Sequence, residues 1–172
     1  LVQVKAALTC GTDLKTYRRG HPTIITSVPS TFGHEFSGVV VEAGKDVTKF
    51  KVGDRIVGAN TAPCFECEHC KNKRYSLCEN LEYLNGAYSE YVAVPAHILK
   101  YNFYYVPEHL PFEQAALLEP LACAVHGSDR IPAKVGDTVA VIGAGPIGLM
   151  FMKLLSLKGC RVIAVDLSDY RL

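Results

Sequence analysis

The sequence lacks an excess of either charge and a long apolar run, and we expect no secretory leader. Its 18 basic and 17 acidic residues give a net charge of +1, and the charges are scattered, so we expect neither nucleic acid nor a membrane as a partner. No apolar run approaches the roughly 18 residues of a membrane span, and no signal peptide heads the chain. The chain begins at Leu1 without methionine, within an alternating pattern, so we expect a short segment to precede it in a longer protein.

Composition places the chain among ordinary globular proteins. Apolar residues make up 49% and charged residues 20% of the 172 positions, which excludes disorder as the main description. This length is enough for one full domain and part of a second. The seven cysteines are odd in number, and four of them lie within residues 64–78. Without a secretory leader, such clustering favours metal thiolates in a reducing cytoplasm over disulfides.

Short apolar stretches separated by glycine and proline dominate the first part of the sequence. The alternation at residues 1–8 predicts a half-buried strand, and residues 15–31, polar and without a period, predict a long loop. The turn Lys51-Val-Gly-Asp54 recurs as Lys134-Val-Gly-Asp137, and both predict a tight turn leading into a strand. Many short strands up to about residue 106 predict a small antiparallel barrel. Its further strands are expected at residues 36–42, 54–59, 88–94 and 98–106.

The segment 112–126 has the pattern of two helices. Residues 112–118 predict a short helix, and Pro120 suits the first turn of a second one, where its missing N–H is not needed. Glu119 therefore lies at a helix junction, where a carboxylate could swing toward a metal; taken alone, it would be an ordinary charge near a helix start. Cys123 and His126 follow on the second helix and are expected to be packing residues.

The most specific pattern is Cys64-x-x-Cys67-x-x-Cys70-x7-Cys78. Four thiolates at this spacing can enclose one tetrahedral zinc and leave no position for water, which is typical of a structural site. Four unrelated cysteines would be the alternative, but cysteine is rarely this dense. His69 lies inside the pattern and is expected to be a solvated surface residue, because the cysteines already complete the ligand set.

Other potential metal ligands come from three separate segments: Cys10, the pair His34-Glu35, and Glu119. Each alone has a commoner explanation, since a free cysteine is usually a small buried hydrophobe and a lone histidine is usually hydrogen-bonded. Together, beside a nucleotide motif, they predict a catalytic zinc site with an open position. Thr12 offers a hydroxyl for the proton of a bound alcohol, and Asp13 offers a carboxylate for the second nitrogen of the histidine.

A nucleotide-binding pattern follows a buried strand. Residues 137–142 form a near-continuous apolar run, typical of a parallel sheet. The run leads into Gly143-Ala144-Gly145-Pro146-Ile147-Gly148. The glycines allow a tight turn and a close approach to a pyrophosphate, and the helix that begins there would hold the phosphate charge. Residues 161–165 predict the next strand, and Asp166 after it should bond the adenosine ribose hydroxyls, which favours NAD over NADP.

These residues resemble the zinc-dependent medium-chain alcohol dehydrogenase family, and the match covers nearly the whole chain. The motifs occur in the family's order: Cys10-Gly-Thr-Asp13, Gly33-His-Glu35, the lobe 64–78, Glu119-Pro-Leu121 and Gly143–Gly148. The resemblance implies a mixed β and α/β architecture, with a GroES-like antiparallel β-barrel catalytic domain at 1–130 and the start of a Rossmann domain at 131–172. It also implies catalytic and structural zinc, NAD, hydride transfer from a small-molecule alcohol, and homo-oligomers among full-length members.

The resemblance implies Cys10 and His34 as zinc ligands, with Glu35 or Glu119 and a water completing the shell. A glutamate in place of the second cysteine of simple alcohol dehydrogenases is similar to the polyol and threonine dehydrogenase branch, and residues 118–126 resemble sorbitol dehydrogenases. One departure is Lys15, which stands where the family usually has a proton-relay histidine. A second is the end at Leu172, just past the second Rossmann strand, so we expect an inactive portion of a longer enzyme.

Two other interpretations stay open. A zinc-ribbon module that binds nucleic acid would explain the four-cysteine lobe but would leave Cys10, His34 and the glycine motif without a role. A zinc-free quinone reductase, or another relative with the same barrel, would share the fold but hold no metal. Salt-dependent DNA binding would favour the first interpretation, and an absence of zinc would favour the second.

Overall fold

The computed structural model describes residues 1–21, 25 and 27–172, so the predicted loop at 15–31 lies partly outside the described residues, at 22–24 and 26. The chain divides into two compact units, Leu1–Glu119 and Pro120–Leu172. The division falls inside helix α5 (Leu118–Asp129), whereas the sequence-based boundary at residue 130 lies at the end of that helix. None of the described helices combines the length and apolarity needed to cross a bilayer.

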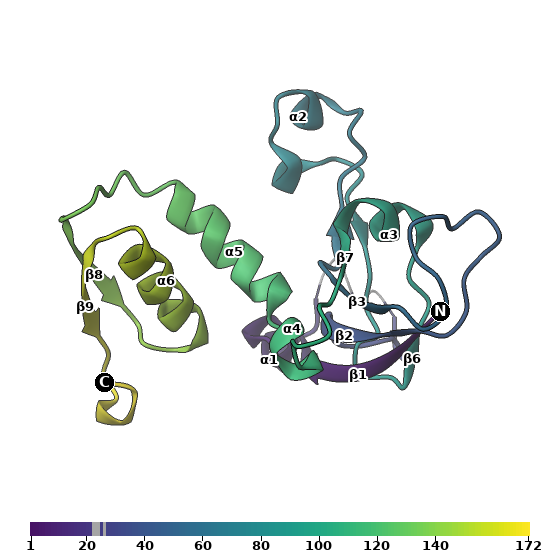
Figure 1. Ribbon diagram of the computed structural model, residues 1–172, viewed down its shortest axis with the longest axis horizontal. Helices are drawn as coiled ribbons and strands as arrows, with labels where there is room; N and C mark the ends of the chain where they lie inside the picture. The colour runs from purple at the N-terminus through teal and green to yellow at the C-terminus, as the bar shows by residue number, and fades with distance from the viewer. Residues whose placement is uncertain (22–24, 26) are drawn as a thin grey trace. The chain divides into compact units, whose positions relative to one another are not determined.

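A five-stranded antiparallel sheet forms the centre of the first unit (Figure 1). Its order is β6-β1-β2-β3-β7, and these strands span Tyr91–Val92, Val2–Leu8, Glu35–Val40, Arg55–Gly58 and Phe103–Tyr105. β1 and β2 pair from Val2 opposite Val40 to Leu8 opposite Glu35, with an irregularity between Val4 and Ala6. The strands predicted at 1–8, 36–42 and 54–59 are therefore present, with slightly different ends.

Side chains from most of these strands meet in one apolar cluster. Phe36 is 1% exposed, Ile56, Ile98 and Phe103 are 0% exposed, and the ring centroids of Phe36 and Phe103 lie 5.9 Å apart. Burying a large apolar side chain contributes roughly 1.5–3 kcal/mol relative to leaving it in water. The cluster therefore holds the strands together with the helix that carries Ile98.

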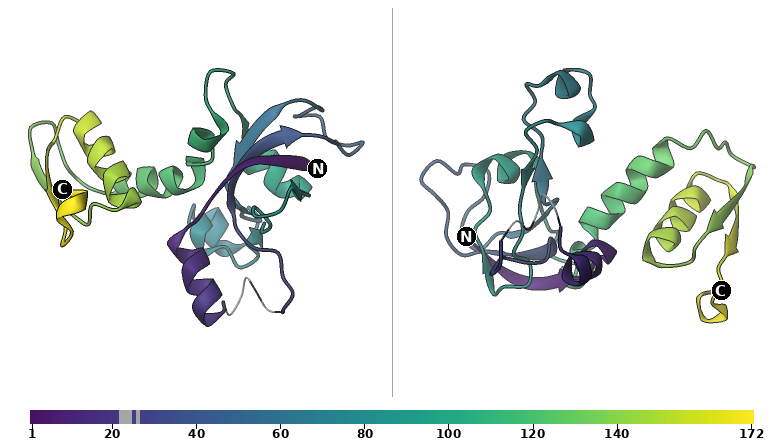
Figure 2. Two further views of the ribbon diagram at one scale, coloured as in Figure 1. Left: turned by 90° about the horizontal axis from the view of Figure 1, so that it is seen from below. Right: turned by 180° about the vertical axis from the view of Figure 1, so that it is seen from behind.

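The segment after β1 is helical, which corrects the prediction of a loop from residue 15. Helix α1 spans Gly11–Arg19 and follows the end of β1 directly (Figure 2). The Cys10 thiol accepts the N–H of Thr12 at 3.4 Å, and the Asp13 carboxylate accepts the N–H of Cys10 at 2.8 Å. These contacts satisfy backbone donors that a helix start leaves unpaired. The polar sequence hides the helix because cysteine is not one of the usual capping residues.

The strand predicted at 98–106 is mostly a helix. Helix α3 spans Ala96–Asn102, and only Phe103–Tyr105 pair as β7. The helix turns Ile98 into the core, whereas the aromatic and β-branched composition of this stretch favours a strand. The strand predicted at 88–94 is likewise reduced to the two residues of β6, because Ser89 closes a turn in which its N–H donates to the carbonyl oxygen of Gly86 at 3.1 Å.

A small lobe stands away from the sheet of the first unit (Figure 1). Its base is closed by the antiparallel pair β4 (Thr61–Ala62) and β5 (Glu82–Tyr83). Between them lie the short helix α2 (Glu68–Lys71) and the 3-10 helix η1 (Tyr75–Leu77). The lobe therefore carries the whole four-cysteine pattern on one excursion of the chain.

The second unit contains the predicted parallel strand pair. β8 (Thr138–Ile142) and β9 (Arg161–Val165) pair in parallel and are linked by α6 (Pro146–Leu157), and η2 (Asp169–Arg171) follows. A Cβ at Gly148 would lie only 1.8 Å from the carbonyl oxygen of Gly143. Any larger residue there would force helix α6 away from the glycine loop.

Both Lys-Val-Gly-Asp turns are built by the same hydrogen bonds. The N–H of Lys51 donates to Asp54 Oδ2 at 2.8 Å, and the N–H of Lys134 donates to Asp137 Oδ2 at 2.8 Å. The intervening glycines have φ of +94° and +90°, a conformation that costs other residues free energy. The predicted turn-into-strand signal is confirmed at both places.

Arg55 on β3 holds the loop that leads to helix α4 (Phe112–Ala115). Its guanidinium donates to the carbonyl oxygens of Pro107, Glu108 and Leu110 at 3.3, 2.6 and 2.6 Å. It also lies 4.3 Å from the centre of the Phe112 ring, within the range of a cation–π contact. The Arg55 side chain thus links the sheet to the loop before α4, and that part of the chain leads on to Glu119.

Replacing Arg55 by methionine should lower the free energy of unfolding by about 2 kcal/mol, because three carbonyl groups lose a charged donor while the side-chain length is kept. Urea unfolding followed by circular dichroism measures the change. Lys51→Met is the matched control, since the Lys51 side chain is 87% exposed and its loss should matter by less than about 0.5 kcal/mol. Equal midpoints for the two variants would show that Arg55 does not stabilise this loop.

Candidate functional site

Strand pairing brings three potential metal ligands together at one end of the sheet. β1 and β2 are antiparallel, and Leu8 stands opposite Glu35, so Cys10 beyond one strand and His34 before the other lie at the same end. The Cys10 Sγ, a ring nitrogen of His34 and a Glu35 carboxylate oxygen all lie within 4.8 Å of one another. Sulfur, imidazole nitrogen and carboxylate oxygen are the three donor types that zinc takes in proteins.

His34 is oriented by Asp13. Asp13 Oδ1 lies 3.1 Å from His34 Nδ1, and the Asp13 residue is only 5% exposed. Because a carboxylate oxygen accepts hydrogen bonds, Nδ1 is the donor in this contact, and Nε2 is the ring nitrogen left to face a metal. Nε2 is also the ring nitrogen that faces Glu35, with 3.9 Å between Nε2 and Oε1. The predicted support of the histidine by Asp13 is present in the structure.

Glu35 is 4% exposed, and its burial and the charged groups around it shift the pKa of its carboxyl. Burial raises the pKa of its carboxyl above the usual range, and the nearby charge of Glu119 raises it further. His34 and a hydrogen bond with the Cys10 thiol act in the opposite direction. A buried carboxylate crowded by a second acid is a place where a bound cation would relieve the desolvation and the repulsion together.

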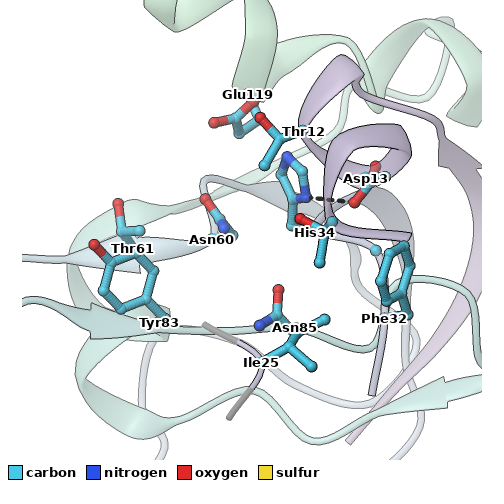
Figure 3. Close-up of a pocket in the computed structure, with 12 residues that line it drawn as sticks. Thr12, Asp13, Ile25, Phe32, His34, Asn60, Thr61, Tyr83, Asn85 and Glu119 are labelled. Atoms are coloured by element: carbon cyan, nitrogen blue, oxygen red, sulfur yellow. Dashed lines mark hydrogen bonds and ion pairs between the residues drawn. The ribbon is translucent and has the colours of Figure 1, made fainter. Parts of the chain in front are cut away.

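A cavity of about 120 Å³ opens beside this group, and Figure 3 shows His34, Thr12 and Glu119 around it. Space of this size holds on the order of four water molecules. Thr12 and Glu119, both predicted site residues, lie on its wall, whereas Lys15 is an exposed residue of α1. Besides Thr16 of α1, four polar lining residues were not predicted: Asn60, Thr61, Tyr83 and Asn85.

These polar lining residues come from the two strands at the base of the lobe and their neighbours. Thr61 on β4 pairs with Tyr83 on β5, while Asn60 and Asn85 lie just outside the pair. In the sequence, these polar residues stand on either side of the four-cysteine pattern. No other feature of the sequence could have identified them as lining residues. Their convergence on the cavity depends on strand pairing, which no local motif reveals.

Tyr88 is a further residue that the sequence does not single out. Its hydroxyl donates to Asp13 Oδ2 at 2.8 Å, and the carbonyl oxygen of Leu8 lies 3.2 Å from the same hydroxyl oxygen. Partial burial raises the pKa of this phenol, so the hydroxyl stays a donor at neutral pH. Asp13 therefore has partners on both of its oxygens.

The four lobe cysteines also converge. All four sulfurs lie within 4.8 Å of one another, with Sγ–Sγ distances of 3.5 Å for Cys64–Cys78 and 4.0 Å for both Cys64–Cys70 and Cys67–Cys78. Sulfurs at the corners of a tetrahedron with zinc–sulfur bonds of 2.3 Å would be about 3.8 Å apart. The donor set and its spacing fit a closed zinc site.

Backbone donors prepare one of these thiols for a cation. The N–H groups of Glu66 and Cys67 lie 3.5 and 3.4 Å from Cys64 Sγ, and they lower the pKa of Cys64 to about 6. Burial instead raises the pKa of Cys70 to about 12. Four neighbouring thiols cannot all be deprotonated without a cation, because their negative charges repel one another. Binding of a divalent metal would therefore release protons from the lobe.

The predicted nucleotide motif lies in the second unit, between β8 and α6. Gly143 has a φ of +105°, and Gly145 precedes Pro146, Ile147 and Gly148 in the first turn of α6. Asp166 after β9 accepts the N–H groups of Ala144 and Ser168 at 2.7 and 2.9 Å, and these donors lower the pKa of its carboxyl. Its Oδ2 lies 3.5 Å from Nη1 of Arg171. The sequence patterns did not single out Arg171.

Similarity to known proteins covers the whole of this chain. The family model for the alcohol dehydrogenase GroES-like domain matches residues 1–102. Sorbitol dehydrogenase of Bacillus subtilis is 34% identical over 100% of this chain and 50% of its own length. L-threonine 3-dehydrogenase of Deinococcus deserti is 36% identical over 100% of this chain and 51% of its own. The chain thus spans about half the length of the curated relatives it matches.

Solved structures agree with the sequence matches. A protein of Sinorhizobium meliloti described as a zinc-binding dehydrogenase bound to NADP superposes with a TM-score of 0.88 at 37% identity, covering 99% of this chain and 49% of that one. The 2R,3R-butanediol dehydrogenase of Bacillus subtilis gives a TM-score of 0.83 at 36% identity, covering 99% and 51%. The predicted combination of a GroES-like domain with the beginning of a Rossmann domain is confirmed.

The raised pKa of Glu35 predicts a pH dependence of stability in the metal-free chain. The folded state binds this proton more tightly than the unfolded state, whose value is near 4.5, so folding stability should fall as the pH rises from that value through the raised one. Glu35→Gln removes the buried charge and should make the metal-free chain more stable than the parent at pH 7.

Unfolding midpoints of metal-free parent and variant between pH 4 and pH 8 measure this effect. The two proteins should converge at the acidic end, where Glu35 is protonated in both states. Glu42→Gln, at an exposed position, is the control and should leave the profile unchanged. A Glu35→Gln variant that is less stable than the parent at pH 7 would contradict the assignment of a destabilising buried charge.

Proposed function

Because the chain belongs to the zinc-dependent medium-chain alcohol dehydrogenase family, we propose that it supplies the zinc site of an enzyme that transfers a hydride from an alcohol to a nicotinamide cofactor. The observation that carries the proposal is the convergence of Cys10, His34 and Glu35 within 4.8 Å, beside a cavity with a polar wall. A closed four-cysteine group elsewhere in the same unit would hold a second, structural zinc.

The residues present fit a catalytic metal. Cys10 Sγ, His34 Nε2 and the Glu35 carboxylate would hold it, since Nδ1 of His34 is already engaged by Asp13 at 3.1 Å. We assign Glu35 rather than Glu119 as the third ligand because Glu35 lies with the other two donors. Glu119 stands on the wall of the adjoining cavity. A bound zinc supplies Lewis-acid chemistry, which lowers the pKa of an alcohol group toward neutrality.

The chain's own groups orient the alcohol and receive its proton. Thr12 lines the cavity, and its Oγ1 can accept a hydrogen bond from the reacting hydroxyl while its own proton moves outward. Asp13 keeps His34 in one tautomer and one orientation. Lys15, at the position of the family's usual relay histidine, is exposed on α1, so we expect Thr12 to pass the proton to solvent without it.

The cavity favours a polyol over a simple alcohol. Its wall carries the hydroxyls of Thr61 and Tyr83 and the amides of Asn60 and Asn85. Such groups pair with the neighbouring hydroxyls of a polyol, whereas a hydrocarbon chain would leave them unpaired, at a free-energy cost of about 1–3 kcal/mol each when buried. We therefore favour a sorbitol-like substrate, with threonine as the second candidate because it also carries polar groups beside its hydroxyl.

The second unit offers a binding site for the adenosine end of NAD. The glycine loop and the start of α6 suit a pyrophosphate, and a cavity of about 530 Å³ lies beside Asp166 and Arg171. The Asp166 carboxylate is 8% exposed, and the low pKa that its backbone donors give it keeps it charged at neutral pH. The charged Asp166 carboxylate would repel the 2′-phosphate of NADP, although Arg171 partly balances its negative charge.

Partners and location follow from the same proposal. A small-molecule alcohol and the nicotinamide cofactor are the expected ligands, and we propose a cytoplasmic protein because reduced cysteines suit a zinc lobe. Homo-oligomers are expected of the full-length enzyme. A zinc-ribbon role in nucleic-acid binding has no support in the charge balance, which is +1.

The first test is the zinc content of the purified chain. Elemental analysis should find two zinc ions, and a chelator should remove the one at the open Cys10 site first. His34→Ala should leave only the lobe zinc with little loss of stability, whereas Cys67→Ser should lose the lobe zinc and lower the thermal midpoint. A parent protein that binds a single zinc would remove the catalytic site from the proposal.

Cofactor choice is tested by titrating NADH and NADPH into the protein and following nicotinamide fluorescence. NADH should bind more tightly, and Asp166→Ala should narrow or reverse the ratio, because Arg171 would then meet a 2′-phosphate unopposed. The ratio is the readout, since loss of the bond to Ala144 weakens both complexes. Asp169→Ala, at an exposed position of η2, is the control, and equal affinities of the parent for both cofactors would contradict the assignment.

A further inference from the structure

Tyr88 bridges segments that meet at the ligand site. Its hydroxyl lies 2.8 Å from Asp13 Oδ2 and 3.2 Å from the carbonyl oxygen of Leu8. The other oxygen of the same carboxylate, Oδ1, contacts His34 Nδ1 at 3.1 Å (Figure 3). Tyr88 and His34 therefore hold opposite oxygens of one buried acid.

The ring of Tyr88 occupies a place that the backbone provides for it. Gly33 has a φ of +83°, and a Cβ at that position would lie 2.7 Å from a Tyr88 ring carbon. The N–H of Tyr88 donates to the carbonyl oxygen of Phe32 at 3.1 Å, and the two rings lie 5.9 Å apart between centroids. The tyrosine is thus packed against the residues immediately before His34, on a segment fixed by its own backbone.

Two hydrogen-bond donors to Oδ2 fix the orientation of the Asp13 carboxylate. The Cys10 N–H reaches Oδ2 at 2.8 Å, from the helix start, and the Tyr88 hydroxyl reaches the same atom from another segment. Together they fix the carboxylate plane and aim Oδ1 at the imidazole. If the hydroxyl were absent, one backbone donor would remain and the plane could turn about the bond to Cβ. The imidazole would then lose part of its fixed orientation.

We propose that Tyr88 is a positioning residue for the catalytic metal site, acting by locking Asp13, which in turn orients His34. The inference rests on the proposed function, because it assumes that Cys10, His34 and Glu35 hold a metal. Tyr88 does not line the substrate cavity, and its hydroxyl hydrogen bond goes to Asp13 rather than to a proposed metal ligand. The effect of the hydroxyl is therefore expected to pass through Asp13, and that dependence can be tested separately from catalysis.

The test compares zinc release from the zinc-loaded parent chain and Tyr88→Phe. A colorimetric chelator in excess should remove the zinc at Cys10 about 3–10-fold faster from the variant, a loss at the lower end of that seen when partners of ligating histidines are removed. Release of the lobe zinc is the internal reference and should not change. Tyr91→Phe is the matched control, because the Tyr91 hydroxyl lies on β6 and contacts only Gln3 Nε2, at 3.5 Å, among the described side chains.

A double-mutant cycle shows whether the effect passes through Asp13. Asp13→Asn should also speed release, and adding Tyr88→Phe to it should change nothing further, whereas independent effects would add. Additive effects would overturn the inference and assign Tyr88 to packing or to its contact with Leu8. With cobalt in place of zinc, the visible spectrum of Tyr88→Phe should shift in the same direction as that of Asp13→Asn.

The outcomes separate the inference from the function that it assumes. If the parent binds two zinc ions and Tyr88→Phe releases both at the parent's rates, the positioning role of Tyr88 is wrong and the proposed function stands. If the parent binds only the lobe zinc, the proposed function fails and the inference fails with it. Thermal midpoints of parent and variant should agree closely, which shows that faster release does not come from a looser fold.

Discussion

The antiparallel register between β1 and β2 is the constraint on which the proposed catalytic site depends. Leu8 stands opposite Glu35, so the residues just outside this pair, Cys10 and His34, face each other across the end of the ladder. A shift of one residue would turn Glu35 to the other face of the sheet and separate it from the other two donors. The buried side chains of Val2 and Phe36 make such a shift costly. The hydrophobic core thus fixes the metal site without contributing a ligand.

The two cysteine-containing sites differ in how the chain assembles them. The lobe sulfurs come from one short excursion closed by β4 and β5, so their convergence needs no distant pairing. Cys10 follows β1, whereas the adjacent residues His34 and Glu35 lie at the start of β2, so their convergence depends on the sheet. This difference explains why the four lobe sulfurs lie within 4.8 Å of one another with no cavity residue among them, while the second group of potential ligands borders a cavity. A ligand that must be exchanged is better placed where two segments leave a gap between them.

The same difference sets what the sequence could predict. The lobe, the two Lys-Val-Gly-Asp turns and the glycine motif are local patterns, and the structure contains each of them. Helix α1 was missed because a cysteine caps it, and helix α3 was missed because its residues favour strands. Asn60, Asn85 and Tyr88 reach the site through pairing between distant segments, which leaves no mark in local spacing. The sequence grouped Cys10 and His34 with either Glu35 or Glu119, and the strand register gives a physical reason for placing Glu35 with the first two.

One local hydrogen-bond pattern recurs in this chain and has different roles at different positions. Asp13, Asp54 and Asp137 each accept, through Oδ2 at 2.8 Å, the N–H of the residue three positions earlier. At Asp54 the second oxygen lies 3.8 Å from the amine of the exposed Lys51 side chain, and the carboxylate serves the turn. At Asp13 the second oxygen meets His34. The capping geometry is the same, so its chemical role follows from what the sheet places opposite the carboxylate.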